Sequence, residues 1–302
     1  MANLERRRML KKYSGVILLL RDACVAVALV ALVLLAMYAY TGQWPPMVVI
    51  ESNSMMHGEE NLSNVGTIDT GDLVLVQEID SVTDVETYAE GVVSGHRTYG
   101  DFGDVIVYKP DGSEHVTPII HRAMIFLMVN ADGDSYRAES LRDLPAYKWS
   151  LSNPTDTWDH LTGTLYLNNV GWSGSTVAIN IGGLGVPYRS GFITKGDHNP
   201  SIDQPYRSGN IELDWVVGKA RGEIPWFGLL KLWSTHTLKS TAPENSVRNL
   251  WISIALIVIA PILIDVTMTY RAKKKIAKKK EEGRRDGVRD PPTKERKEED
   301  GG

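Results

Sequence analysis

One short stretch decides how the fold is interpreted: Val48-Val49-Ile50-Glu51-Ser52-Asn53-Ser54-Met55-Met56-His57-Gly58. Its β-branched residues predict a strand from Met47 to Ile50, and the Ser-x-Ser-Met sequence predicts a turn after it. The turn follows an apolar run of membrane length, so we expect it close to a bilayer surface. A serine there is an ordinary turn residue unless the fold supplies a general base and an orienting carboxylate, because a serine hydroxyl is a poor nucleophile by itself.

Charge is segregated along the 302-residue chain, although the formal net charge is only −4. Basic residues flank two apolar runs, and the region between the runs is acidic. This pattern predicts a membrane protein with a soluble central domain and argues against nucleic-acid binding. The single cysteine, Cys24, lies within the first apolar run, so the central domain is predicted to contain no disulfide.

The first apolar run predicts an N-terminal anchor. Residues 16–40 are expected to cross the membrane, after a basic cytoplasmic N-terminus at residues 1–15. A cleavable signal peptide is the alternative, but no small-x-small cleavage site follows the run, so the anchor is predicted to stay attached.

The second apolar run predicts another transmembrane helix at residues 250–270, although Pro261 and Asp265 interrupt it. Lys and Arg lie on the outer side of both runs, so the positive-inside rule predicts a multi-pass cell-membrane protein with both termini in the cytoplasm. Residues 41–249 are then an extracytoplasmic domain. Residues 271–302, basic and then mixed in charge, are predicted to be a disordered cytoplasmic tail.

The central domain is predicted to be mainly β. Turn-then-strand patterns begin at Thr70 and Gly103, and a long β-rich stretch covers Val116 to Val129. Residues 130–190 are polar and rich in Gly, Asn, Asp and Trp, which predicts an inserted excursion with short strands. The apolar and aromatic segment 225–233 suits either the bilayer surface or the core.

Few residues in this domain could act as a base. Seven histidines occur, and none has the spacing of a zinc site, so neither a metal nor a cofactor is expected. His121 lies in an apolar strand, where a histidine is ordinarily a core residue but where desolvation also favours the neutral imidazole that a base requires. Asp197 and Asp203 lie in a polar loop, where acids ordinarily cap turns. Spacing alone does not bring Ser54, His121 and Asp203 together.

Six segments, in order behind an N-terminal anchor, resemble type I signal peptidases of the archaeal and endoplasmic-reticulum branch. They are Glu51-Ser52-Asn53-Ser54-Met55, Thr70-Gly71-Asp72-Leu73-Val74, Gly103-Asp104-Val105-Ile106-Val107-Tyr108, Ile120-His121-Arg122, Thr194-Lys195-Gly196-Asp197-His198-Asn199 with Asp203, and Val217-Gly218-Lys219-Ala220-Arg221-Gly222-Glu223-Ile224-Pro225. The resemblance covers the first anchor and the β core, but neither residues 130–190 nor the tail.

The resemblance implies a signal-peptidase-like β-strand catalytic domain and a serine endopeptidase that removes signal peptides from secreted and membrane precursors. It implies Ser54 as the nucleophile, His121 as the general base where the bacterial branch has lysine, and Asp203 as the orienting acid. Asp197 would be a second supporting acid, and the Ser54 backbone N–H with the Ser52 hydroxyl would form the oxyanion hole. The implied partners are signal peptides, the lipid bilayer and the protein-export channel.

Two residues depart from the family pattern. His57 stands where a proline usually follows the Ser-Met pair by one residue, and His198 replaces the commoner asparagine after Gly-Asp. Both changes add imidazoles near the expected site. The relative roles of His57 and His198, and of Asp197 and Asp203, therefore stay open.

Three alternatives to a general signal peptidase also stay open. The first is a Ser/Lys enzyme that uses Lys109 or Lys195 as its base. The second is a non-catalytic, membrane-anchored β domain that scaffolds or binds exported proteins. The third is a signal-peptidase relative tuned to a narrow set of precursors.

Overall fold

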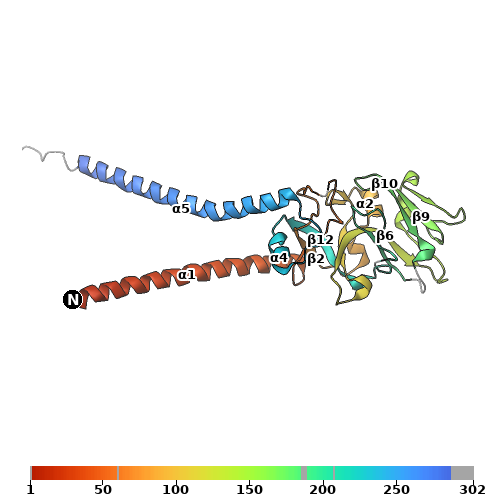
Figure 1. Ribbon diagram of the computed structural model, residues 1–302, viewed down its shortest axis with the longest axis horizontal. Coiled ribbons are helices and arrows are strands. Elements are labelled where there is room, and N and C mark those ends of the chain that lie inside the picture. Colours follow the sequence, from red (N-terminus) through yellow and green to blue (C-terminus); the bar gives the residue numbers. More distant parts are fainter. Residues whose placement is uncertain (1, 60, 185–188, 207, 287–302) are drawn as a thin grey trace, which may run out of the picture. The chain divides into compact units, whose positions relative to one another are not determined.

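The computed structural model describes residues 2–59, 61–184, 189–206 and 208–286, and these divide into two compact units between Arg248 and Asn249. The protein is mainly β, with one long apolar helix at each end of the sequence, as predicted (Figure 1). The helices are α1 (Ala2–Thr41), α2 (Tyr88–Ser94), α3 (Ser140–Asp143), α4 (Gly228–Thr235) and α5 (Glu244–Asp286). The strands are β1 (Met47–Val49), β2 (Leu73–Gln77), β3 (Arg97–Thr98), β4 (Asp101–Phe102), β5 (Val105–Tyr108), β6 (Ile119–Val129), β7 (Tyr136–Arg137), β8 (Trp149–Leu151), β9 (Thr164–Val170), β10 (Ser175–Asn180), β11 (Gly191–Lys195) and β12 (Val216–Ile224).

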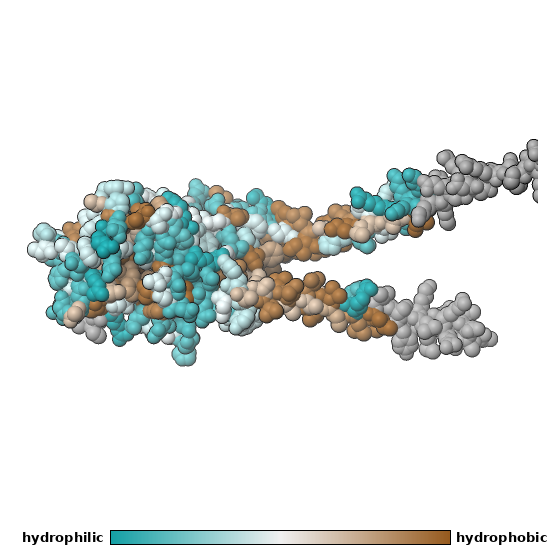
Figure 2. Space-filling model, turned by 180° about the vertical axis from the view of Figure 1, so that it is seen from behind, coloured by the Kyte–Doolittle hydropathy of each residue, from teal (hydrophilic) through white to brown (hydrophobic). Residues whose placement is uncertain are grey.

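Helices α1 and α5 each contain a segment that is long and apolar enough to cross a membrane. These segments are Leu19–Thr41 and Glu244–Lys278. The apolar side chains of α1 are exposed and form the brown surface of that helix in Figure 2. Pro261 lies inside α5 without ending the helix.

The C-terminal segment differs from the prediction of a disordered tail over residues 271–302. Helix α5 continues to Asp286, so residues 271–286 are helical. The physical reason lies in the composition, because Lys, Ala, Arg and Glu all have high helix propensity and the preceding apolar helix supplies the nucleus. Residues 287–302 lie outside the described residues.

The main sheet is seven-stranded and curls into half a barrel. Its strand order is β1-β2-β12-β5-β6-β11, and β7 pairs with the far end of β6. Every pairing in it is antiparallel. Strand β6 runs between β5 and β11, and it is buried on both faces from His121 to Ile125. Strand β6 therefore holds His121 in a buried position, next to β5.

Residues 130–190 form a part of the domain built on a three-stranded sheet, β10-β9-β8. Its apolar side chains, including Leu165, Leu167 and Val177, share one core cluster with Met124 and Leu127 of β6. This excursion, which we call the inserted subdomain, is thereby packed firmly against the strand that carries His121. Burying each such side chain contributes about 1.5–3 kcal/mol.

The apolar segment 225–233 leads into α4 and forms most of that helix, which begins at Gly228. Leu229 and Leu232 are buried, whereas Leu230 and Trp233 are exposed. The two interpretations of this segment therefore apply to different faces of one short helix. One face belongs to the core, and the other offers apolar side chains to the surroundings.

Candidate active site

Ser54 lies on a turn whose neighbouring side chains are buried in the core. The lead-in strand β1 ends at Val49, and Ile50 exchanges backbone hydrogen bonds with the loop before β2. The turn closes where the Met56 N–H donates to the Asn53 carbonyl at 3.1 Å. Met55 and Met56 are both buried, so their thioether side chains anchor the turn in the core and leave the Ser54 side chain at the surface of a groove.

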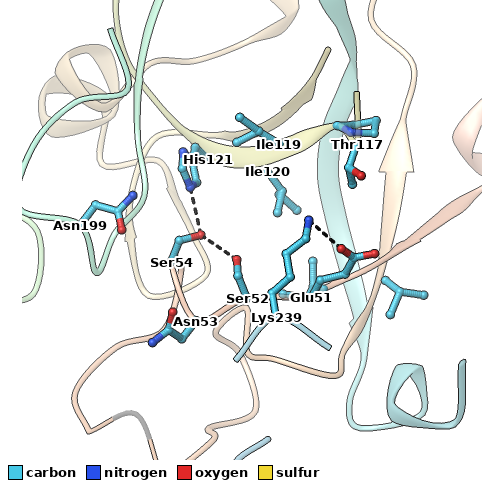
Figure 3. Close-up of a pocket in the computed structure, with 13 residues that line it drawn as sticks. Glu51, Ser52, Asn53, Ser54, Thr117, Ile119, Ile120, His121, Asn199 and Lys239 are labelled. Carbon is cyan, nitrogen blue, oxygen red and sulfur yellow. Dashed lines mark hydrogen bonds and ion pairs between the residues drawn. The ribbon is translucent and has the colours of Figure 1, made fainter. Parts of the chain in front are cut away.

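His121 reaches Ser54 from the first part of β6. It pairs with Ile106 of β5 in the strand register, and it is 2% exposed. Its Nε2 lies 3.0 Å from Ser54 Oγ (Figure 3). This is the distance at which a neutral imidazole accepts the hydroxyl proton.

Asp203 lies on the other side of the imidazole. Its Oδ2 is 2.5 Å from His121 Nδ1, and it also accepts hydrogen bonds from Thr194 Oγ1 at 2.8 Å and from the Tyr108 hydroxyl at 3.0 Å. Burial alone would raise the pKa of Asp203, but the hydrogen bonds and the neighbouring imidazole outweigh it and lower the pKa below its ordinary value. The carboxylate is therefore ionised, and it holds the tautomer with the proton on Nδ1.

The hydrogen-bond chain from Ser54 through His121 to Asp203 joins three separate parts of the sequence. No protein-family model and no curated protein sequence matches this chain. The chemical interpretation of the site therefore rests on geometry and on the sequence segments around it. Such a chain of hydroxyl, imidazole and carboxylate can remove a proton from the serine as it attacks and stabilise the imidazolium that results.

Gly196 has no room for a side chain beside this chain of groups. A Cβ atom there would lie 2.6 Å from the Ser54 carbonyl oxygen and 2.8 Å from His121 Nε2. The glycine lets the loop after β11 pass directly behind the serine. In the same loop, the backbone N–H of His198 donates to the Ser54 carbonyl at 2.9 Å.

Asp197 does not join the triad directly. Its carboxylate accepts two hydrogen bonds from Arg122, at 2.8 Å and 2.6 Å, and its Oδ2 lies 2.8 Å from His57 Nε2. Burial would raise the pKa of Asp197, but the Arg122 charge and these hydrogen bonds lower it far below its ordinary value. Asp197 therefore has the geometry of a supporting acid, which fixes the loop behind Ser54 through Arg122 and His57.

Arg122 is itself fully buried. Burial alone would lower the pKa of the Arg122 guanidinium. The charge of Asp197 and the hydrogen bonds to it outweigh this effect and raise the pKa above its ordinary value. The remaining guanidinium nitrogen, Nη1, donates to a ring of backbone carbonyls, those of Thr98, Asp101, Phe102 and Gly103. This one cation connects the loop behind the serine to the loop before β5.

Ser52 lies beside Ser54, with 3.3 Å between the two hydroxyl oxygens. The position agrees with a hydroxyl that could donate to an oxyanion near Ser54, which is the role that the resemblance implies. That role, and the role of the Ser54 backbone N–H, stay predictions.

The two lysines that could replace His121 as the base have other partners. Lys195 Nζ donates to the carbonyls of Gly196 and Asp197, and Lys109 Nζ lies 2.7 Å from Glu114. Burial lowers the pKa of Lys195, which the charge of Asp197 opposes. In the described chain, the hydrogen bonds found for Ser54 Oγ run to His121 and Ser52. The geometry thus favours His121 as the base.

A groove of about 250 Å³ opens beside Ser54 and His121. One wall is the segment from Val49 to Ser54, and the other is the start of β6 with the residues before it. An ion pair between Lys239 and Glu51 lies along the groove at 2.8 Å (Figure 3).

Several side chains at the site were missed by the sequence analysis. They are Tyr108 and Thr194 beside Asp203, Arg122 beside Asp197, Lys239 in the groove, and Trp172 of the inserted subdomain, which stacks on two histidines. Tyr108, Arg122 and Thr194 lie within segments that the resemblance singled out, which was a usable signal. Nothing local marks Lys239 or Trp172, because only the fold brings them to the site.

Across the described ranges, no group of three or more His, Cys, Asp or Glu side chains has the arrangement of a metal site.

Proposed function

We propose that this protein is a membrane-bound serine endopeptidase that removes N-terminal signal peptides from secreted and membrane precursors. The observation that carries the proposal is the buried hydrogen-bond chain from Ser54 through His121 to Asp203. The six ordered segments around it support an assignment to type I signal peptidases of the archaeal and endoplasmic-reticulum branch. They equally support a signal-peptidase-like fold for the β domain.

The proposed reaction has two stages. Ser54 Oγ attacks the carbonyl carbon of the scissile peptide bond as its proton passes to His121 Nε2, and Asp203 stabilises the imidazolium. The tetrahedral intermediate collapses when His121 returns this proton to the leaving amine, which frees the mature protein. Water, deprotonated by His121, then hydrolyses the ester between the leader and Ser54.

The groove supports a peptide substrate in an extended conformation. Strand β1 is the end strand of the described sheet, and β11 pairs with β6 only from Arg122 onward. The outer edge of β1 and the Ile119–His121 edge of β6 can therefore donate and accept hydrogen bonds with an added strand. The small volume and the lining by Ile119 and Ile120 suit small residues before the cut, which the resemblance implies.

The connection to α1 supports a site close to a membrane surface. Helix α1 ends at Thr41, whose carbonyl accepts the Glu78 N–H at 2.8 Å, and Gln43 Nε2 donates to the Val76 carbonyl at 2.8 Å. These bonds tie the end of the helix to β2. The β domain is therefore attached directly to the end of α1. If both α1 and the signal peptide lie in the same bilayer, this attachment limits the volume in which the enzyme and its substrate have to find each other.

The proposed location is the cell membrane. The basic residues outside both apolar segments support cytoplasmic termini and an extracytoplasmic β domain. Signal peptides, the bilayer and the protein-export channel are the proposed partners.

The test is cleavage of a precursor with a small-x-small site by the full-length protein in lipid vesicles, with the cut mapped by mass spectrometry. We expect cleavage at that site, loss of cleavage in His121→Ala, and retained cleavage in Lys109→Ala. Full activity in His121→Ala would favour a Ser/Lys mechanism instead. Absence of processing by folded protein would favour the non-catalytic scaffold, and cleavage of only one leader among several would indicate a narrow specificity.

A further inference from the structure

The inserted subdomain reaches the active site through one hairpin. Strands β9 and β10 are joined by the turn Gly171-Trp172-Ser173-Gly174, which closes with a hydrogen bond from the Gly174 N–H to the Gly171 carbonyl at 3.2 Å. Gly171 and Gly174 have φ values of 70° and 65°, a conformation that glycine adopts without strain. The turn is therefore well defined by its own sequence.

The end of β9 that leads into this turn is fixed to the rest of the domain. The Asn169 carbonyl accepts hydrogen bonds from Lys148 Nζ at 2.9 Å and from the Tyr88 hydroxyl at 3.3 Å. Val170 is buried in the core cluster that also contains Met124 of β6. Any side chain at the tip is thus held in a constant position relative to the strand that carries His121.

Trp172 at the tip stacks on two imidazoles. Its ring centroid lies 6.2 Å from that of His57, with 28° between the planes, and 6.2 Å from that of His198, with 18° between the planes. These values lie within the range in which aromatic pairs attract each other. The two histidines are the residues at which the chain departs from the family pattern.

The two imidazoles belong to the two loops that meet behind Ser54. His57 follows the nucleophile turn and contacts the Asp197 carboxylate, while the His198 backbone N–H donates to the Ser54 carbonyl. A ring that stacks on both His57 and His198 therefore bridges these two loops. Trp172 is not among the described lining residues of the groove.

We propose that Trp172 is a positioning residue: its indole, stacked on both His57 and His198, couples the inserted subdomain to the loops that carry Ser54 and Asp197. The role in catalysis rests on the proposed peptidase function, whereas the effect on Ser54 does not depend on the identity of the substrate. The proposal assigns a role to the inserted subdomain, because its β9–β10 hairpin would keep Ser54 oriented toward His121.

The test compares four variants of the full-length protein in lipid vesicles. Trp172→Ala removes the ring, Trp172→Leu keeps bulk without a ring, and Trp172→Phe keeps a ring. Tyr147→Ala, which removes an exposed aromatic residue of the same subdomain, is the matched control. Two readouts are measured, namely kcat and KM for precursor cleavage and the rate at which a fluorophosphonate probe labels Ser54. In labelling, Ser54 Oγ bonds to phosphorus, fluoride leaves, and the hydroxyl proton passes to His121.

We expect Trp172→Ala and Trp172→Leu to lower kcat and the labelling rate about 10- to 100-fold, with KM within about twofold, because small displacements of a nucleophile are costly. Trp172→Phe should stay within about threefold of wild type because it retains the stack. Tyr147→Ala should match wild type. Should no precursor be cleaved while labelling still follows the presence of the ring, the positioning role would stand and the proposed substrate would not.

Two results would overturn the proposal. One is that both Trp172→Ala and Trp172→Leu keep the kcat and the labelling rate of wild type. If their KM were raised at the same time, Trp172 would be a substrate contact instead. The other is loss of the folded state in both variants by thermal melting, since the indole would then be a core residue. Trp172 is 47% exposed, so both variants are expected to fold.

Discussion

Replacing Asp203 with asparagine separates two functions of this carboxylate, the orientation of His121 and the supply of negative charge. All three hydrogen bonds that Asp203 accepts from His121, Thr194 and Tyr108 end on the same oxygen, Oδ2. In Asp203→Asn the amide oxygen should take that position, because it can accept from all three donors and the amide nitrogen cannot. His121 would then keep its proton on Nδ1, and Nε2 would still accept from Ser54.

The expected loss is therefore that of the charge alone. The side chains of His121 and Asp203 are 2% and 1% exposed, so solvent screens them little. Two unit charges about 4 Å apart at an effective dielectric constant of about 20 interact by about 4 kcal/mol, which is an upper limit for the stabilisation of the imidazolium. At 1.36 kcal/mol for each factor of ten, this limit corresponds to about 10³ in kcat. We expect a fall of about 10²- to 10³-fold, with KM nearly unchanged because the groove is intact.

The assay is precursor cleavage by the full-length variant, with Asp134→Asn, a substitution in an exposed loop, as the control. A fall of less than about tenfold would refute the role of Asp203 in stabilising charge on His121. A fall of 10⁴-fold or more would refute the inferred orientation of the amide, because a loss of that order indicates the wrong imidazole tautomer.

Three further predictions concern stability and specificity. Arg122→Ala should lower the free energy of unfolding by about 3–5 kcal/mol, because it leaves Asp197 buried without its cation. Arg122→Lys should lower it by less. Equal melting temperatures for Arg122→Ala and wild type would contradict this prediction. Burial raises the pKa of Asp72 from 3.8 to about 7, despite hydrogen bonds from backbone N–H groups. Folding therefore favours the protonated form of Asp72. The stability that Asp72 contributes is present below pH 3.8 and is lost as the pH rises through about 7. Melting temperatures measured across that window should fall more with pH for wild type than for Asp72→Asn, and parallel curves would count against the shift. Ile120→Phe should fill the groove and raise KM about tenfold or more, whereas Val116→Phe, outside the groove lining, should leave KM unchanged.

The fold could be predicted in outline because its strands carry strong local signals. β-branched residues after Gly-Asp turns identify β2 and β5, and a long apolar run identifies β6. The pairing of these strands could not be predicted, since β12 inserts between β2 and β5 although it is the last of the described strands. Contacts this distant in sequence depend on the whole core rather than on local propensity.

The candidate site was predictable in its parts but not in its arrangement. Ser54, His121 and Asp203 could be named from ordered segments, and the structure brings His121 within hydrogen-bond distance of both Ser54 and Asp203. The surroundings of Asp203 were not accessible from the sequence, because Tyr108 and Thr194 come from two different strands. The difference between the two acids also required the structure, which connects Asp197 to Arg122 rather than to His121.

The most direct test of the central claim is cleavage of one secretory precursor by purified wild-type protein and by Ser54→Ala, side by side in lipid vesicles. The account predicts that wild type produces a mature chain that begins immediately after the small-x-small site, and that Ser54→Ala, folded to the same melting temperature, produces none. Equal processing by the two proteins would remove Ser54 from the mechanism and contradict the account.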